Sequence, residues 1–491
     1  MSMWGVVAGL ALTVAPARPG PWAQLAEQDL AAMRQAILES HPGPVDTRNP
    51  GFKQWLEAGY RESMGLAREA RSFGGYQAAL LRYAAGFRDG HLGVGITLQP
   101  LSVQWPGFLV AGRAGKVVVA TLDETAPDGL PALGSELLAC DGTPPEAMMT
   151  RDILPYLRGA DVEPLHLKAA TALLADVGNP RVVRPKACTF RGPEGTEHTV
   201  TLRYRPIAPD RLSDRQAQVT FGAKPEFGVQ RFGEGGVWVS MPTFGAMDDA
   251  TLNKLKSIVA QAPEWKDAKT IVFDVRGNTG GSSAWGDRLL EGLYGEAYYA
   301  ARVRQSPVFR SAYVEWRVSR DNLAHVGALI TQLTREQGAD SPIVKELGVL
   351  QRGMEEARKK GQALYREPDE PTQPAPATPP EPGTRARVVL LTDGRCASAC
   401  LDFADRVLQL PGVTHVGRTT SADSVYMEVR PVELPGGVAR LVLPVKVYRD
   451  RPRGHNVPYV PKVRYDGEPG DTAAVRRWIE GLVAEGAPAR P

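Results

Sequence analysis

Apolar positions in the first hundred residues recur with the spacing of a helix. Between residues 22 and 88 they form three sets, each on one helix face: Leu30, Met33, Ile37 and Leu38; Phe52, Trp55 and Leu56; Tyr76, Leu80, Tyr83 and Phe87. His-Pro-Gly at 41–43 and Phe-Gly-Gly at 73–75 separate the sets. This pattern predicts a small helical domain, within a region 22–100 that ends in an Asp-Gly-His segment.

From about residue 101 to 210 the pattern changes to short β-rich runs. Residues 116–120 read Lys-Val-Val-Val-Ala, and residues 199–204 read Thr-Val-Thr-Leu-Arg-Tyr. Such runs predict a second, mostly β domain. Residues 130–142, which contain a strand-like run and a closing Asp-Gly turn, resemble a segment of PDZ domains. We therefore expect this domain to be PDZ-like.

Strand and helix patterns alternate after residue 230. Residues 237–241, 252–260 and 270–275 read as strand, helix and strand, which is typical of an α/β layer with a largely buried sheet. The sheet is expected to resume at 388–391 and again at 441–445. A last helix is expected from Thr472, with Asp471 as its N-cap. The predicted α/β core thus comprises residues 230–301 and 385–491.

A long insertion, residues 302–384, separates the two halves of this core. Its composition is helical to about Arg366, and residues 368–383 hold seven prolines in sixteen positions. Such a proline density excludes a helix or a central strand. We expect a flexible connector beside a helical lid; the alternative is a solvent-exposed excursion without a catalytic role.

Composition and charge limit the partners. The 491 residues, 43% of them hydrophobic, are enough for two to four domains. Basic and acidic residues nearly balance, 58 against 55, and no run of five or more Lys or Arg occurs. We therefore expect no nucleic-acid partner.

The N-terminal residues resemble an export signal. An apolar run from Val6 to Val14 precedes Ala-Pro-Ala at 15–17, although no Lys or Arg comes before it. We expect a leader at 1–21 and a periplasmic or extracellular location; an apolar N-terminal tail is the alternative. No later run reaches the ~20 apolar residues of a membrane span, so no integral membrane segment is expected after the leader.

The four cysteines do not predict a metal site. Cys140, Cys188, Cys396 and Cys400 lack the paired Cys-x-x-Cys spacing of structural zinc, so neither a metal nor another cofactor is expected. Cys140 and Cys188 could form a disulfide in an exported protein or remain two buried thiols.

Two segments carry candidate chemistry. In residues 392–404 a strand ends, a turn follows, and small residues surround Ser398 before a helix begins. A helix N-terminus suits a nucleophile because its N–H groups can stabilise an oxyanion, although a serine there is commonly only a cap. Residues 274–282, Asp-Val-Arg-Gly-Asn-Thr-Gly-Gly-Ser, follow another strand and could supply further amides. They are not a phosphate loop, because no Gly-Lys-Ser/Thr follows.

Together, the motifs at 274–281 and 397–400 resemble the tail-specific and carboxyl-terminal processing proteases and the core of tricorn protease. The resemblance covers about 235–300 and 386–470. It implies a crotonase-like α/β core and a serine peptidase acting on peptide or protein substrates, often exported and with a PDZ domain ahead of the core. It also implies that Ser398 is the nucleophile, Gly280 or Gly281 one oxyanion donor, and Ala399 the other.

The general base departs from the lysine branch of this family. The family's lysine follows the serine by 25 residues, where this chain has Asp423. Residues 89–91, Asp-Gly-His, resemble the segment of the tricorn-like branch in which histidine is the base. A histidine with a pKa near 6.5 can accept the serine proton at neutral pH, whereas an aspartate near 3.9 is a poor base. We therefore assign proton transfer to His91.

Several alternatives remain at this stage. Asp423 could orient His91 as the acid of a triad, or be a solvated loop aspartate. Cys396 and Cys400 flank Ser398; one of them as nucleophile is a minor alternative to their packing as small apolar residues. The chain as a whole could be an active serine hydrolase or a non-catalytic protein that binds peptides or other ligands on the same fold.

Overall fold

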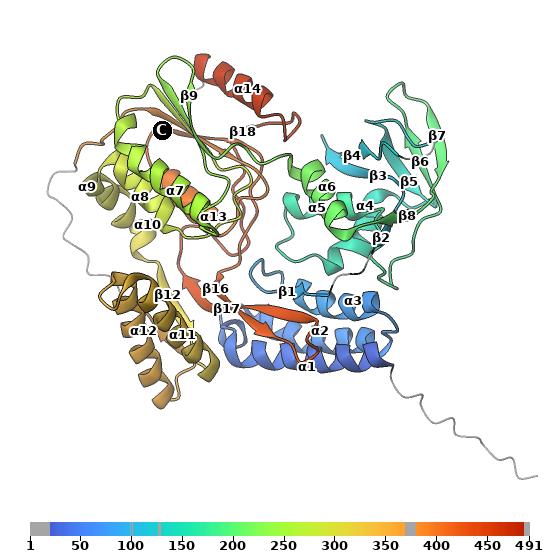
Figure 1. Cartoon of the computed structure of the whole chain (residues 1–491), viewed down its shortest axis with the longest axis horizontal. Helices are drawn as coiled ribbons and strands as arrows, with labels where there is room; N and C mark the ends of the chain where they lie inside the picture. The colour runs from blue at the N-terminus through green and yellow to red at the C-terminus, as the bar shows by residue number, and fades with distance from the viewer. Residues whose placement is uncertain (1–19, 99, 101, 126–128, 369–379, 486–491) are drawn as a thin grey trace, which may run out of the picture.

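The computed structural model describes residues 20–98, 100, 102–125, 129–368 and 380–485 (Figure 1). The predicted leader lies outside these residues except for its last two positions, as does most of the proline-rich connector. None of the helices in the described residues is both long enough and apolar enough to span a bilayer.

Three helices form the N-terminal region: α1 (Pro21–Ser40), α2 (Pro50–Arg68) and α3 (Phe73–Ala85), with the short turn η1 (Gly43–Val45) after α1. The three predicted apolar faces are confirmed, since Leu30, Leu56 and Leu80 are buried in one cluster, with the exception of Leu38, which is 37% exposed. The predicted break at 73–75 is wrong, because α3 begins there. Ser72 is its N-cap and accepts a hydrogen bond from Gly75 N–H at 3.2 Å.

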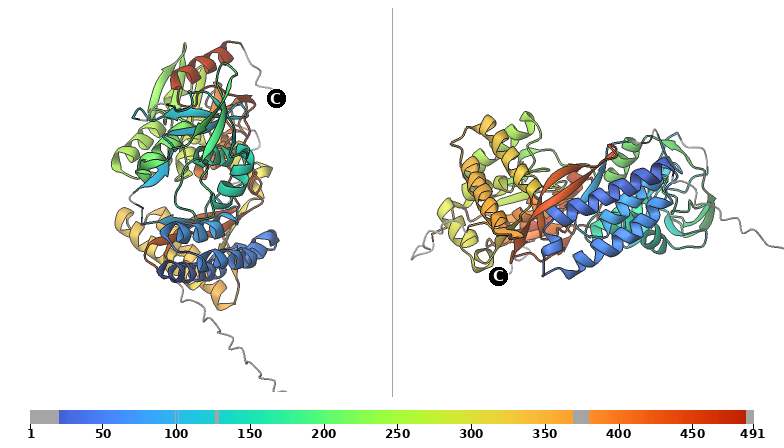
Figure 2. Two further views of the ribbon diagram at one scale, coloured as in Figure 1. Left: turned by 90° about the vertical axis from the view of Figure 1, so that its right-hand side faces the viewer. Right: turned by 90° about the horizontal axis from the view of Figure 1, so that it is seen from below.

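The N-terminal helices pack against a five-stranded sheet from distant parts of the chain. Its members are β1 (Gly93–Ile96), β12 (Tyr313–Arg317), β13 (Leu364–Arg366), β16 (Tyr426–Glu433) and β17 (Ala439–Arg449). Figure 2 shows β16 and β17 lying along these helices. The prediction that residues 441–445 continue the sheet of 388–391 is therefore wrong. Leu441 and Leu443 instead share the core of the N-terminal helices.

The insertion contributes strands as well as helices. Its elements η5 (Ala300–Arg304), α10 (Pro307–Arg310), α11 (Arg320–Gln337) and α12 (Pro342–Lys359) agree with the predicted helical composition. Strands β12 and β13 do not, and β12 pairs with β17. The insertion is therefore part of the five-stranded sheet. Its Trp316 and Met354 also share a core with Val445 of β17.

The β-rich region contains one larger and one smaller sheet. The larger sheet is antiparallel in the order β3 (Phe108–Arg113), β4 (Lys116–Leu122), β5 (Glu136–Cys140), β6 (Ala187–Arg191) and β7 (Glu197–Thr201). Strands β2 (Val103–Trp105) and β8 (Arg205–Ile207) form a separate pair. Helices α4 (Pro145–Met148) and α5 (Glu163–Ala172), with the turns η2 (Met149–Ile153) and η3 (Leu154–Tyr156), lie between β5 and β6 in the chain, and α6 (Pro209–Phe221) leads onward.

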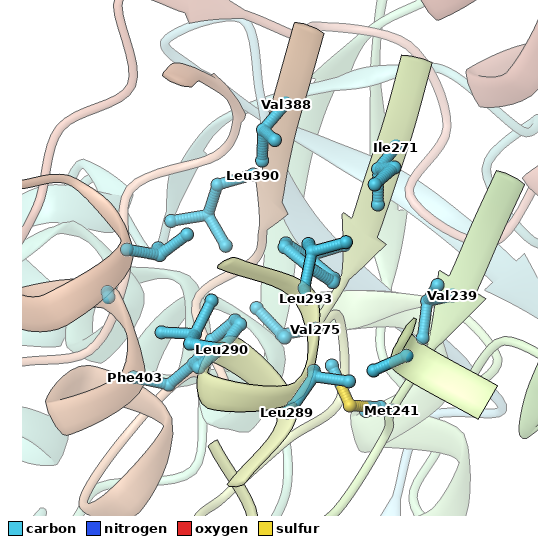
Figure 3. Close-up of a cluster of buried hydrophobic side chains, with 14 of the residues drawn as sticks. Val239, Met241, Ile271, Val275, Leu289, Leu290, Leu293, Val388, Leu390 and Phe403 are labelled. Atoms are coloured by element: carbon cyan, nitrogen blue, oxygen red, sulfur yellow. The ribbon is translucent and has the colours of Figure 1, made fainter. Parts of the chain in front are cut away.

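The predicted α/β layer is confirmed. A six-stranded sheet runs in the order β18 (Val463–Arg464), β15 (Val413–Gly417), β14 (Arg387–Thr392), β11 (Thr270–Asp274), β10 (Gly236–Ser240) and β9 (Gly228–Phe232). All neighbours are parallel except β9 and β10. One face packs against α7 (Asp249–Gln261), η4 (Ala262–Trp265), α8 (Ala284–Tyr294), α9 (Glu296–Tyr299) and α13 (Ala399–Val407). Figure 3 shows part of this apolar core, with side chains of α8 and α13 beside those of the strands.

Helix α14 (Thr472–Ala484) covers the other face of this sheet through Val475 and Ile479. Its predicted N-cap is confirmed, because Asp471 Oδ1 accepts a hydrogen bond from Ala474 N–H at 2.8 Å. The carboxyl ends of the parallel strands β11 and β14 lie side by side, in the register Asp274 to Leu391. Loops that follow such ends meet at one edge of a sheet, so this edge is where the two motif segments belong.

Candidate active site

The turns that follow β11 and β14 touch at Gly280 and Ser398. A Cβ added at Gly280 would lie 2.6 Å from the Ser398 Cβ and 3.0 Å from the Ala397 carbonyl oxygen. The Ala397 N–H also donates to the Asn278 carbonyl oxygen at 3.3 Å. A side chain at position 280 would therefore displace the serine, and with φ near +104° this position favours glycine for its backbone as well.

Ser398 has the geometry of a presented nucleophile. It precedes α13 with φ 56° and ψ −127°, in a region that non-glycine residues seldom occupy. Its hydroxyl does not cap the helix and makes no hydrogen bond to the described residues. The reading of Ser398 as an ordinary N-cap therefore fails, and the Oγ is available for chemistry.

Asp423 holds the backbone of this turn. Its Oδ2 accepts a hydrogen bond from the Ser398 N–H at 2.6 Å, and the residue is only 2% exposed. The alternative of a solvated loop aspartate is therefore wrong. A charged acceptor on a buried amide is among the stronger hydrogen bonds in proteins, so Asp423 stabilises the unusual conformation of Ser398.

The candidate oxyanion donors differ in how they are engaged. The Gly280 N–H donates to Asn278 Oδ1 at 2.9 Å, so it is already occupied. Gly281 sits between two hydrogen bonds that its neighbours Gly280 and Ser282 make with Phe244, each 2.9 Å long. The N–H groups of Gly281 and Ala399 form no hydrogen bond to another described residue. Of the predicted donors, these two have an amide free for a ligand.

The backbone of His91 is held by the buried carboxylate of Asp89. Asp89, 1% exposed, accepts hydrogen bonds from the His91 N–H and the Ser424 hydroxyl, both at 2.8 Å. A Cβ on Gly90 would lie 3.8 Å from Asp423 Oδ1. Asp423 therefore lies between the Asp-Gly-His turn and Ser398. The His91 ring is partly exposed, while its Nδ1 is buried and lacks a partner among the described residues.

His41, from the predicted helix break at 41–43, lies near this turn and is a fully buried, hydrogen-bonded residue. Its Nδ1 accepts the Gly43 N–H at 2.8 Å, so the proton of the neutral ring is on Nε2, 3.4 Å from Asp89 Oδ2. Burial lowers the pKa of His41 despite the nearby carboxylate. Burial alone would raise the pKa of Asp89, but its interactions with His41 and His91 bring it below the usual value. The pair is thus a neutral histidine beside an ionised aspartate.

Asn456 is a second residue that the sequence did not reveal. Its N–H donates to the Asp423 carbonyl oxygen at 2.9 Å, and its Nδ2 donates to the Arg88 carbonyl oxygen at 2.8 Å. Its Oδ1, like His91 Nδ1, is buried without a partner among the described residues. Asn456 ties the loop of Asp423 to the Asp-Gly-His turn, and a lone loop asparagine carries no sequence signal for such a role.

All four cysteines are paired. Cys140 and Cys188, opposite each other on β5 and β6, form one disulfide, which resolves the alternative left open by the sequence. Cys396 and Cys400 form the other, across Ser398. Both residues are buried in the apolar core, which confirms the predicted packing, although their disulfide was not predicted. A cysteine nucleophile is excluded because both sulfurs are bonded.

Neither a metal cluster nor the cavity described next points to another centre in the described residues. No group of three or more His, Cys, Asp or Glu among them is placed to hold a metal ion. A cavity of about 570 Å³ lies between β3, β4, α6 and residues 468–471. None of the candidate catalytic residues lines it, so we place the candidate chemistry at Ser398 on the geometry above.

Known proteins resemble this chain in one family model and in fold. Residues 237–456 match the model of peptidase family S41. The crystal structure of mature CPAF is similar with a TM-score of 0.63 and 14% identity, covering 96% of this chain and 100% of that chain. Mature CPAF complexed with lactacystin gives 0.61 and 15%, over 95% and 100%. At these identities the structural likeness shows a shared fold alone. None of the curated proteins matches this chain in sequence.

Proposed function

Because the chain belongs to peptidase family S41 through residues 237–456 and is a serine peptidase-like hydrolase, we propose that it cleaves peptide or protein substrates with Ser398 as nucleophile and His91 as general base. The observation that carries the proposal is the state of Ser398. Its hydroxyl is uncapped at the start of α13, beside free amides, in a backbone conformation held by a buried aspartate.

In this mechanism His91 removes the hydroxyl proton as Ser398 Oγ attacks the scissile carbonyl, and then donates that proton to the leaving amine. The negative charge that develops on the carbonyl oxygen is stabilised by the N–H groups of Gly281 and Ala399 and by the N-terminus of α13. We assign the first donor to Gly281 rather than Gly280, since the Gly280 amide is bonded to Asn278.

Asp423 acts on the geometry and charge of the site, and does not act as a base. One carboxylate oxygen fixes the Ser398 N–H, and the other faces the turn at Gly90. A negative charge near His91 favours the imidazolium that forms during proton transfer. Asn456 supports the same turn from the opposite side, and its Oδ1 is the acceptor that we propose for the proton on His91 Nδ1.

The finer architecture belongs to the same proposal. The six-stranded sheet with helices on both faces is compatible with a crotonase-like core, and the β3 to β7 sheet with α5 is compatible with a PDZ-like domain. We further propose that the protein is exported. Two disulfides support this location, because disulfides persist mainly in oxidising compartments.

A fluorophosphonate probe tests the proposal directly. We expect a covalent adduct that peptide mapping places on Ser398, that is absent from Ser398→Ala, and that forms far more slowly in His91→Ala. Hydrolysis of casein or a peptide library should depend on the same residues. A native chain that binds peptides but neither reacts with the probe nor hydrolyses them would be a non-catalytic binding protein, and our proposal would be wrong.

A further inference from the structure

The disulfide between Cys396 and Cys400 closes a ring of five residues around the proposed nucleophile. These residues read Cys-Ala-Ser-Ala-Cys, with Ser398 in the middle. Both cysteines are fully buried in the apolar core of the α/β layer, whereas Ser398 is partly exposed. The bond therefore lies on the core side of the turn, and the serine lies on the side that is open to solvent.

The backbone of this ring differs from that of the helix that follows it. Ser398 has φ 56° and ψ −127°. The Cys400 N–H donates to the Ala397 carbonyl oxygen at 3.1 Å, and the Asp402 N–H donates to the Ser398 carbonyl oxygen at 3.1 Å. The second of these bonds is the first that spans a full helical turn, because the carbonyl of an N-cap residue accepts the first bond of its helix. Helix α13 therefore begins after the serine.

The segment has a competing conformation, in which α13 extends backward through Ser398. Ala397 and Ala399 favour it, because alanine has the highest helix propensity of all residues. The extension would also remove the cost of the unusual Ser398 φ and ψ. In that conformation Ser398 would be an ordinary helical residue, and its Oγ would no longer be placed by the turn.

A disulfide between residues 396 and 400 disfavours this extension. Residues four apart on a helix have Cβ atoms about 5–6 Å apart, whereas a disulfide brings its Cβ atoms to about 3.5–4.5 Å. In the observed turn the Cα atoms of Cys396 and Cys400 lie 5.3 Å apart, within the range of about 4.4–6.8 Å that disulfides accept. The bond is thus compatible with the observed turn and conflicts with a regular helix over the same residues.

We propose that the Cys396–Cys400 disulfide is a positioning element that keeps Ser398 in the conformation from which it attacks. Asp423 holds the serine N–H, and the disulfide holds both ends of the turn from the core. Two constraints of different chemistry thus offset the backbone cost of this conformation. The inference rests on the proposed function, since it concerns the nucleophile of the same reaction.

The test compares the two disulfides of the chain. The site variant is Cys396→Ala with Cys400→Ala. The matched control is Cys140→Ala with Cys188→Ala, which removes the other buried disulfide, between β5 and β6. Hydrolysis of a peptide gives kcat and KM, a fluorophosphonate gives the labelling rate of the serine, and thermal unfolding gives the stability of each variant.

We expect the site variant to lose kcat and labelling rate about tenfold to a hundredfold, since a displacement of about 1 Å in a reacting group can cost as much. Its KM should change little, because the disulfide holds the nucleophile and not the substrate. The control should keep its kcat. It should nevertheless lose at least as much thermal stability, because its cysteines are 48 residues apart and those of the site disulfide are 4 apart, and a longer loop restricts the unfolded chain more.

A second measurement leaves both sulfur-bearing side chains in place. In the control variant Cys396 and Cys400 are the remaining cysteines of the chain. This variant is unfolded, reduced with dithiothreitol, and refolded with the reductant or after its removal in air; alkylation and mass measurement count the free thiols. The reduced sample should have the lower kcat, and oxidation should restore it. This comparison decides the inference even if the site variant does not fold.

Equal kcat for the folded oxidised and reduced samples, within threefold, overturns the positioning role. Losses of kcat that follow thermal stability in both disulfide variants also overturn it, because they indicate general destabilisation. If the native chain neither hydrolyses peptides nor reacts with the probe, the catalytic proposal is wrong instead. The NMR chemical shift of the Ser398 Cα, assigned by its absence in Ser398→Ala, then decides the inference: it should move toward the helical value on reduction, and an unchanged shift overturns it.

Discussion

Replacing Gly280 with alanine should inactivate the site through contact with Ser398. The new Cβ would lie 2.6 Å from the Ser398 Cβ, whereas two carbon atoms pack at about 3.5–4.0 Å, so one of them must move by about 1 Å. A displacement of about 1 Å in a reacting group can lower turnover by roughly a hundredfold. Alanine at φ +104° adds a backbone cost of about 1–2 kcal/mol. We therefore expect kcat/KM to fall about a hundredfold.

The matched control separates strain from displacement. Gly412, in the turn between α13 and β15, has φ +75° and open space where its Cβ would be. Gly412→Ala should therefore lose a similar amount of stability and keep its activity. The measurements are peptide hydrolysis, the rate of fluorophosphonate labelling, and thermal unfolding of both variants. If Gly280→Ala retained activity within threefold of the unchanged chain while folded, the close approach of Gly280 to the nucleophile would have no catalytic meaning.

Three further predictions concern the catalytic unit and the core beneath it. Asp423→Asn should lower kcat at least about tenfold with little change in KM, because a charged acceptor of the Ser398 N–H is lost. Asp423→Lys should be inactive. If the native chain were inactive and the Asp423→Lys variant active, the histidine mechanism would be refuted. His91→Ala and Ser398→Ala should lower turnover by comparable factors, and their double variant should be little worse than either; additive losses would show that they do not act as one unit. Burial lowers the pKa of His415 to about 4, below the ~6.5 of the unfolded chain. Below pH 6.5 the unfolded state therefore binds a proton that the folded state does not bind. The free energy of unfolding is unaffected by His415 above pH 6.5, and it decreases as the pH falls toward 4, by about 3 kcal/mol at most. Urea unfolding across this range should show a flatter pH dependence in His415→Gln, and an unchanged slope would contradict the reasoning.

The α/β layer was predictable because its signals are local. The strand at 270–275 is apolar apart from Thr270 and Asp274, and all six residues are buried in the structure. The helix at 472–484 follows a capping aspartate. The strand, turn and helix around Ser398 were predictable for a similar reason. The motif around Ser398 stood out through its resemblance to the protease family, whereas the uncapped state of its hydroxyl is visible only in the structure.

The placement of β17 could not be predicted, because its pairing is not local. The run 441–445 is as apolar as a central strand of the α/β sheet, yet it lies among the N-terminal helices and the insertion. Pattern alone reports that a strand is buried, and not which sheet buries it. The same limit applies to His41, whose role depends on Asp89, a residue 48 positions away in the sequence.

The presence of aspartate at position 423, where the lysine branch has its base, goes together with the histidine base that we propose. A lysine there could serve as base, but an aspartate is ionised at neutral pH and has little tendency to take the serine proton. Its charge is instead satisfied by the Ser398 N–H, while its main chain receives hydrogen bonds from Asn456 and Arg451. Such a residue rigidifies the nucleophile turn and requires that a different group move the proton. The Asp-Gly-His turn lies against the second oxygen of that aspartate, so the substitution and the proposed histidine base are two parts of one arrangement.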